Sequence, residues 1–325
     1  MSKSQIEKIR DRTREEAQKS PHPKNKIAAT IWHPNNPDNF VTCTNSYPEV
    51  ISDVIDTRKK IGNASATVHA ETNLMANAAF PTEGAHIFIT DPFCPNCAKN
   101  MAEAGIARIY LDREGFEKDF FKRRQDEFVE KSLKIIEHAG ISVYTVGESG
   151  KVKTIYEADP DYIPLNDFPV EEVQIEQADQ VSFEKAVHRA REQYGEDKHA
   201  VCLAKNELGQ NFEISCLSHP VFGYSISNES LVTQMISHSG GDKYSFWQEA
   251  LNRMMMHLSK RGFTLIGEFV YCSEVPTSRE QVNATGYGIS QINIGDKTES
   301  RDEHGLKAMK TLSKKGVIEY VEMKL

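Results

Sequence analysis

Hydrophobic and polar positions along the first half of the chain predict a layered α/β domain. The polar segment 4–19 is typical of a surface helix, and two apolar runs around a turn rich in Pro and Asn predict a hairpin. Beyond the hairpin, strands alternate with helices, which favours parallel pairing. The expected strands are 26–32, 40–44, 85–90, 107–111 and 141–146, and the expected helices are 69–80, 95–104 and one that ends near His138. The pattern therefore predicts a mixed five-stranded sheet sandwiched by helices.

The pattern changes after this domain. Residues 149–181 are acidic, contain three prolines and show no sustained helical period. Such a composition is typical of an extended connector. We therefore expect a first domain over 1–148, a connector over 149–181 and a second domain over 182–325.

The second domain repeats the first. The segment "EKIRDRTRE" (7–15) is similar to "EKAVHRARE" (184–192). Four further identities share a constant offset of 172: Lys26, Phe40, Ser46 and Pro48 fall on Lys198, Phe212, Ser218 and Pro220. The order of expected elements is also the same. These observations predict an internal duplication, and hence two tandem domains of one α/β fold.

Composition and charge narrow the class of protein. The chain of 325 residues is 39% hydrophobic and 26% charged, so it can build a packed core. No apolar run is long enough to span a bilayer, and the polar N-terminus lacks a signal-peptide core, which predicts a cytoplasmic protein without a membrane partner. The formal net charge of -8 opposes polyanions and argues against long nucleic acid. A mononucleotide remains compatible with this net charge, because one cationic side chain at the binding site can offset the negative field of the whole protein.

Three residues have the spacing of metal ligands, and a glutamate lies near one of them in the sequence. Cys94 and Cys97 lie three apart at an expected helix start, where the helix N-terminus favours thiolates. His69 begins another helix and can be a third ligand, which leaves one tetrahedral position open, as in catalytic zinc sites. Glu71 points elsewhere and can serve as an acid or base. A redox pair is the alternative for Cys-x-x-Cys alone, and His86 is the nearest fourth ligand for a structural zinc.

These motifs carry a resemblance. Residues 24–145 resemble the cytidine deaminase superfamily, and "HAETNLMANAA" and "CPNCAKNMAEAGIARIY" are most similar to deoxycytidylate deaminases. The resemblance implies a cytidine-deaminase-like fold, Zn²⁺ on His69, Cys94 and Cys97, and Glu71 as the proton shuttle. The implied reaction is hydrolytic deamination of a cytosine nucleotide or nucleoside. Guanine, adenine in tRNA, and a zinc-binding regulatory protein without turnover are the alternatives.

The resemblance also implies substrate contacts at Asn45, Ala70 and Phe93. The sequence departs from the family here: Pro92 stands one place early, and Phe93 directly precedes Cys94. The glycine-rich turn of allosteric deoxycytidylate enzymes is replaced by "TNSYPEV". Asn45 could instead cap this turn, and Phe93 could instead pack in the core.

The second copy is expected to lack the metal site. Aligned by sequence, Trp247 replaces His69, Glu249 matches Glu71, Leu217 replaces Asn45, and Val275 and Ser278 replace Cys94 and Cys97. Indole, isopropyl and hydroxyl groups do not substitute for imidazole and thiolates at zinc. The resemblance implies a degenerate deaminase domain that forms an intrachain pseudo-dimer with the first. We expect homo-oligomers built on that unit.

Overall fold

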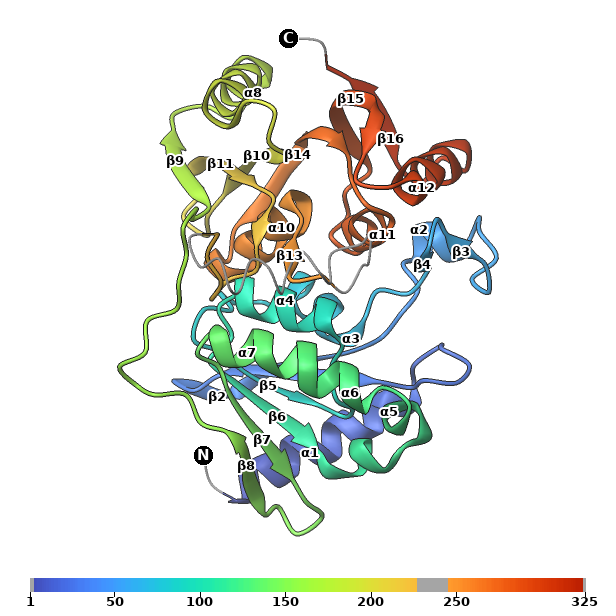
Figure 1. Ribbon diagram of the computed structural model, residues 1–325, viewed down its shortest axis with the longest axis vertical. Helices are drawn as coiled ribbons and strands as arrows, with labels where there is room; N and C mark the ends of the chain where they lie inside the picture. Colours follow the sequence, from blue (N-terminus) through green and yellow to red (C-terminus); the bar gives the residue numbers. More distant parts are fainter. Residues whose placement is uncertain (1–2, 227–244, 324–325) are drawn as a thin grey trace. The chain divides into compact units, whose positions relative to one another are not determined.

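The computed structural model describes residues 3–226 and 245–323 and divides the chain into two compact units (Figure 1). Unit 1 comprises Met1–Ser46, His69–Asp167 and Pro220–Phe246, and unit 2 comprises Tyr47–Val68, Phe168–His219 and Trp247–Leu325. These bounds differ from the expected division at 148 and 181. The connector is shared between the units, and each unit includes a segment from the other half of the sequence.

The sheet of unit 1 has six strands in the order β2-β1-β5-β6-β7-β8. Its strands are β1 (Ala28–His33), β2 (Asn36–Thr44), β5 (His86–Ile89), β6 (Arg108–Asp112), β7 (Ser142–Val146) and β8 (Val152–Tyr156). β1 pairs antiparallel with β2 and β5, and β6 pairs parallel with β5 and β7. The five expected strands are present, and β8 from the connector adds an antiparallel edge.

Helices cover both faces of this sheet. α1 (Lys3–Gln18) lies on one face, and α3 (Ala70–Ala76), α4 (Pro95–Glu103) and α7 (Lys134–His138) lie on the other (Figure 1). The helix expected to end near His138 is divided into shorter segments. They are η1 (Arg113–Glu117), α5 (Asp119–Lys122), α6 (Gln125–Glu127), the π-helical η2 (Phe128–Leu133) and α7.

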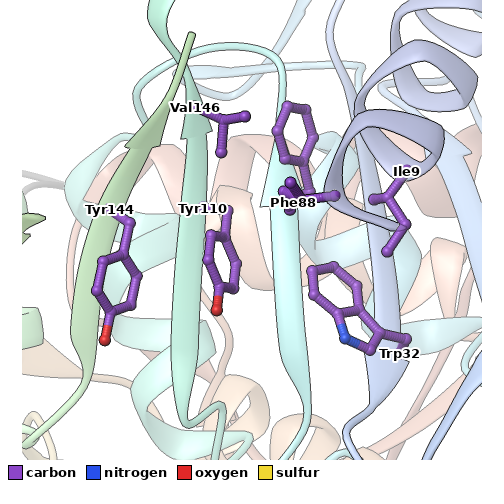
Figure 2. Close-up of a cluster of buried hydrophobic side chains, with 7 residues drawn as sticks. Ile9, Trp32, Phe88, Tyr110, Tyr144 and Val146 are labelled. Atoms are coloured by element: carbon purple, nitrogen blue, oxygen red, sulfur yellow. The ribbon is translucent and has the colours of Figure 1, made fainter. Parts of the chain in front are cut away.

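The core between α1 and the sheet is largely aromatic. Trp32, Phe88, Tyr110 and Tyr144 project from four neighbouring strands toward α1, where Ile9 meets them (Figure 2). The rings of Tyr110 and Tyr144 stack with centroids 5.1 Å apart. The strands that carry these rings are buried on both faces, which agrees with their apolar runs in the sequence.

The sheet of unit 2 repeats the same arrangement in the order β16-β15-β14-β10-β11-β9. Its strands are β9 (Glu171–Ile175), β10 (His199–Lys205), β11 (Asn211–Leu217), β14 (Thr264–Val275), β15 (Gln291–Ser300) and β16 (Glu319–Glu322). The pairings β10–β11 and β10–β14 are antiparallel, and β14–β15 and β15–β16 are parallel, as in unit 1. The fold class is thus confirmed, with a sixth strand in each sheet on opposite edges.

In unit 2, α8 (Gln180–Tyr194) covers one face of the sheet, and α10 (Ala250–Arg261), α11 (Ser278–Gly286) and α12 (Glu303–Lys314) cover the other (Figure 1). The segment 47–68 adds α2 (Glu49–Ser52) and the short hairpin of β3 (Lys60–Ile61) and β4 (Ala64–Ser65). Two further short strands are β12 (His219–Pro220) and β13 (Trp247–Gln248). Within 3–226 and 245–323, no helix combines the length and apolarity needed to cross a membrane.

Candidate zinc and catalytic site

All three expected metal ligands stand at helix N-termini in unit 1. His69 is the N-cap residue of α3, Cys94 is the N-cap residue of α4, and Cys97 lies in the first turn of α4. Pro95 occupies the first helical position, where its missing N–H is tolerated. Neither N-cap side chain forms a capping hydrogen bond to its helix, so the imidazole and the thiol are available for a metal.

The three side chains converge. The Cys94 and Cys97 sulfurs are 3.6 Å apart, and His69 Nδ1 lies 3.6 Å from Cys94 Sγ and 3.3 Å from Cys97 Sγ. A tetrahedral zinc ion at its usual bond lengths separates two sulfurs by about 3.8 Å and a sulfur and a nitrogen by about 3.6 Å. The cluster therefore fits zinc in both donor type and spacing. Among the described residues it is the one such group of histidine, cysteine and carboxylate side chains.

The local electrostatics favour a thiolate at this cluster. A hydrogen bond from Cys97 lowers the pKa of the Cys94 thiol well below its ordinary value, and His69 lowers it further. Burial raises the pKa of Cys97, as does the neighbouring Cys94 thiolate. A thiolate beside a second thiol and an imidazole is the donor set of a metal centre rather than of an apolar core.

Glu71 lies beside the cluster in the first turn of α3, and its side chain is buried, with 4% of its surface exposed. Burial raises the pKa of its carboxyl above the ordinary value, whereas the nearby His69 lowers it and Cys94 raises it again. A carboxyl with a raised pKa holds a proton more readily than an ordinary carboxylate, which suits a group that accepts and then donates a proton.

Asn45 is held by the loop that follows α1. Its Oδ1 accepts from Ser20 Oγ at 2.7 Å and from the Ile27 amide at 3.0 Å, and its Nδ2 donates to the Asn25 carbonyl at 2.8 Å. Its side chain is buried. These bonds occupy both lone pairs of the amide oxygen, so one N–H of Nδ2 is left to meet a substrate.

Phe93 and Ala70 flank the ligands. Phe93 is buried and packs edge-on against Phe128 of η2, with ring centroids 5.3 Å apart. Ala70 is the buried first residue of α3. His86 is separate from the cluster: it packs edge-on against Trp32 on the α1 face of the sheet, where burial lowers its pKa to about 4. Its place in the aromatic core removes it as a fourth ligand.

The sequence analysis did not predict a role for His22, which lies near the site. His22 lies in the loop that binds Asn45, and its pKa is lowered by burial and by the charge of His69. Its Nδ1 accepts from the amides of Lys24 and Asn25, which shapes the loop. The Pro-flanked triplet "PHP" at 21–23 is the signal in the sequence that marks this turn.

Unit 2 places different residues at the positions of the ligands. Thr90 and Ser273 are equivalent, because their hydroxyls accept from the first amides of β1 and β10. Counted from these residues, Cys94 corresponds to Thr277, the N-cap residue of α11, and Cys97 corresponds to Glu280. The alignment that placed Val275 and Ser278 here is therefore wrong by two positions.

The same correction applies to the histidine. Glu249 is the N-cap residue of α10, with φ -78° and ψ 148°, and it stands where His69 begins α3 with φ -69° and ψ 151°. Trp247 lies two residues earlier, in β13. The Ser218 amide bonds to Lys198 as the Asn45 amide bonds to Ile27, so Ser218, and not Leu217, is equivalent to Asn45. Histidine and both cysteines are absent from the three equivalent positions.

Comparisons with known proteins agree with this geometry. Residues 3–112 match the family of the cytidine and deoxycytidylate deaminase zinc-binding region. An uncharacterized deaminase in the luxG 3′ region of Aliivibrio fischeri is 33% identical over 99 residues, which are 30% of this chain and 65% of that protein. Over residues 3–112 the chain is thus similar to the zinc-binding region of cytidine and deoxycytidylate deaminases.

Two solved structures are also similar to part of the chain. They are the dCMP deaminase of cyanophage S-TIM5 in apo form, with 20% identity and a TM-score of 0.33, and the same enzyme with dCMP and dUMP, with 18% identity and a TM-score of 0.34. Each match covers 45% of this chain and nearly all of the phage protein.

Proposed function

We propose that this protein is a zinc-dependent hydrolytic deaminase that acts on the cytosine base of a nucleotide or nucleoside. The observation that carries the proposal is Glu71, a buried carboxyl in the same turn as a metal-binding histidine and beside two cysteines. The family match to cytidine and deoxycytidylate deaminases supports the choice of base. The net charge of -8 supports a small substrate over long nucleic acid.

His69, Cys94 and Cys97 would hold the zinc. When bound, zinc supplies Lewis acidity that activates water near neutral pH. Glu71 takes a proton from the attacking water and delivers it to the ring nitrogen beside the amine-bearing carbon. It then moves the remaining proton of that water, from the new hydroxyl on the carbon to the amine, and the carbon–nitrogen bond breaks, so that water and base yield a carbonyl and ammonia. The raised pKa of the buried carboxyl suits a group that works in both directions.

The other residues of the site position the substrate in this proposal. Asn45 offers one N–H for a sugar hydroxyl, and its fixed amide oxygen keeps that donor aimed. Phe93 contributes an apolar wall next to Cys94, held in place by Phe128. Ala70 contributes the small first residue of α3, which leaves room near Glu71.

Ammonia release by the purified zinc-loaded protein tests the proposal. The panel is dCMP, CMP, deoxycytidine, cytidine, cytosine, guanine and an adenine-containing tRNA stem-loop. We expect turnover of a cytosine nucleotide or nucleoside and a loss of at least about a hundredfold in Glu71→Gln, which cannot move the proton. Glu15→Gln, on the exposed side of α1, is the control and should retain activity.

Two outcomes would contradict the proposal. Turnover of guanine or of the stem-loop alone would remove cytosine as the substrate. Glu71→Gln activity within tenfold of the unmodified protein, with zinc content equal in both, would remove Glu71 as the proton shuttle.

A further inference from the structure

The backbone that leads to the first cysteine ligand has no regular structure. Residues 90–94, which we call the Cys94 loop, join β5 to α4 and lie in neither a helix nor a strand. Pro92 fixes its own φ, whereas Phe93, between Pro92 and Cys94, keeps two free dihedral angles. The position of the Cys94 sulfur therefore depends on what the rest of unit 1 packs against this loop.

The 3₁₀ helix η1 packs directly on the start of the Cys94 loop. A Cβ added to Gly115 of η1 would lie 2.5 Å from the Thr90 carbonyl oxygen and 2.8 Å from Asp91 Cα. Both are backbone atoms, so only a glycine permits this approach without a shift of the loop. Asp112, the N-cap residue of η1, is itself held by Arg14 through hydrogen bonds of 2.5 and 2.7 Å. The surface under the loop is thus anchored to α1.

Lys118, between η1 and α5, holds the same part of the loop by its charge. Its Nζ donates to Asp91 Oδ2 at 2.7 Å, and Thr90 Oγ1 donates to the same oxygen at 2.9 Å. The side chain of Asp91 is only 5% exposed, whereas that of Lys118 is 46% exposed. Burial raises the pKa of Asp91, and Lys118 lowers it. A buried carboxylate is costly without a partner charge, so Lys118 stabilises the buried position of Asp91.

The other end of the Cys94 loop meets an aromatic cluster. The ring of Phe93 packs edge-on against Phe128, with centroids 5.3 Å apart. Phe128 in turn meets Phe116 and Phe121 at 5.9 and 5.6 Å. The segment 113–128 therefore contacts the loop near both ends, and all of these residues belong to unit 1.

We infer that Lys118 is a positioning residue for the zinc ligand Cys94. This inference rests on the zinc site of the proposed function. Without Lys118, Asp91 would be a buried carboxylate with no partner charge, and we expect the loop to turn it toward water. That rearrangement begins three residues before Cys94 and moves the sulfur away from its place beside Cys97. Groups that orient a metal ligand typically change metal affinity by about 10- to 100-fold when removed.

Metal affinity of the full chain tests this inference. Zinc dissociation constants are measured by competition with a chromogenic chelator for the unmodified protein, Lys118→Met and Lys118→Arg. We expect zinc binding about tenfold weaker in Lys118→Met and close to that of the unmodified protein in Lys118→Arg, which restores the cation. Removal of a positive charge favours a divalent cation through long-range electrostatics, so weaker binding in Lys118→Met cannot come from the change of net charge.

A matched control lies one helical turn away. Lys122→Met removes an exposed lysine whose Nζ lies 3.8 Å from the exposed carboxylate of Asp119, and it should leave zinc affinity unchanged. Cobalt substituted for zinc should show shifted thiolate-to-metal and ligand-field absorption in Lys118→Met, but not in Lys118→Arg or Lys122→Met. Amide hydrogen exchange at 91–94 should accelerate in Lys118→Met, while exchange in β5, β6 and β7 stays unchanged.

The inference and the proposed function fail in different ways. If zinc affinity depends on Lys118 but the protein releases no ammonia from any substrate, the proposed function fails and the positioning role stands. If ammonia is released and zinc affinity does not depend on Lys118, the proposed function stands and the inference fails.

Unchanged zinc affinity and cobalt absorption in Lys118→Met would overturn the inference, even with faster exchange at 91–94, because Lys118 would then only pack the loop. Equal weakening in Lys118→Met and Lys122→Met would also overturn it. If Lys118→Met does not fold, Lys118→Gln gives the decision, since it keeps a polar end and removes only the charge. Weaker zinc binding in Lys118→Gln supports the inference, and unchanged binding overturns it.

Discussion

Glu280 links two helix N-termini in unit 2, and its removal gives a quantitative test of the structure. One carboxylate oxygen accepts from the amides of Leu251 and Asn252 at the start of α10, at 3.0 and 3.3 Å. The other accepts from the amide and the hydroxyl of Thr277, both at 2.8 Å. The side chain is buried, with 3% of its surface exposed. Because Glu280 is equivalent to Cys97, this carboxylate stands where unit 1 has a metal ligand.

The expected cost follows from the groups left without a partner. Glu280→Ala leaves three buried backbone amides unsatisfied, each worth about 1–3 kcal/mol. Relief of the repulsion from Glu249, whose charge raises the pKa of Glu280, offsets part of this. We expect a net loss of about 3–5 kcal/mol in the free energy of unfolding of unit 2. Glu280→Gln keeps one accepting oxygen, so its loss should be about 1–3 kcal/mol.

The pH dependence of stability has a definite sign. Burial raises the pKa of Glu280 from 4.5 to about 7. A carboxyl whose pKa is raised by folding contributes stability that is fully present below its unfolded pKa and is lost as pH rises through its folded pKa. Unit 2 should therefore lose up to about 3 kcal/mol of stability between pH 4.5 and pH 8, and Glu280→Gln should remove this dependence.

Amide hydrogen exchange is the suitable assay, because a chain of two units does not unfold in one transition. Rates at 251–253 and 278–281, corrected for the intrinsic effect of pH, report the two helix starts. Glu303→Gln is the control, because its carboxylate forms only an exposed ion pair with Lys307, and exposed pairs contribute little to stability. Unaltered protection at both helix starts in Glu280→Ala, or protection that rises with pH in the unmodified protein, would refute the reasoning.

Two further predictions concern the turn at Gly62 and the metal. Gly62→Ala and Gly209→Ala both place a side chain at a positive φ, +59° and +76°, but of these two glycines only Gly62 faces a backbone oxygen. We therefore expect Gly62→Ala to destabilise unit 2 by about 2 kcal/mol more than Gly209→Ala. Equal melting temperatures of the two variants would contradict this. Zinc removal by a chelator should increase hydrogen exchange at the starts of α3 and α4 and leave exchange in α10 and α11 unchanged. Cys97→Ser should show the same pattern without the chelator. Equal increases in both units would contradict the assignment of the metal to unit 1.

The sequence predicted the elements of unit 1 well because their signals are local. The central strands β1 and β5 are short apolar runs buried on both faces, and Pro95 begins α4 where its fixed φ is tolerated. The ligand cluster was predictable for the same reason, since Cys94 and Cys97 are one turn apart and both lie at a helix start. The division of the helix before His138 was not predictable, because the π-helical segment Phe128–Leu133 contains no proline or glycine that would mark it.

The second half was harder to predict in detail. The sequence alignment matched Glu71 with Glu249 and so placed Trp247 at His69, whereas the N-cap of α10 places Glu249 there. Insertions within a degenerate copy shift the register without altering the hydrophobic pattern. The placement of Tyr47–Val68 in unit 2 also has no signal in the sequence. Arg279 donates a hydrogen bond to the backbone carbonyl of Thr67, and every residue has such a carbonyl.

In each unit two helix N-termini lie close together, and the two units place different side chains at these termini. In unit 1, His69 and the cysteines at these termini leave their imidazole and thiols to a metal. In unit 2, the carboxylate of Glu280 accepts directly from both helices, and Arg301 neutralises Glu249 through a hydrogen bond of 2.6 Å. Unit 2 therefore needs no metal to hold α11 in place.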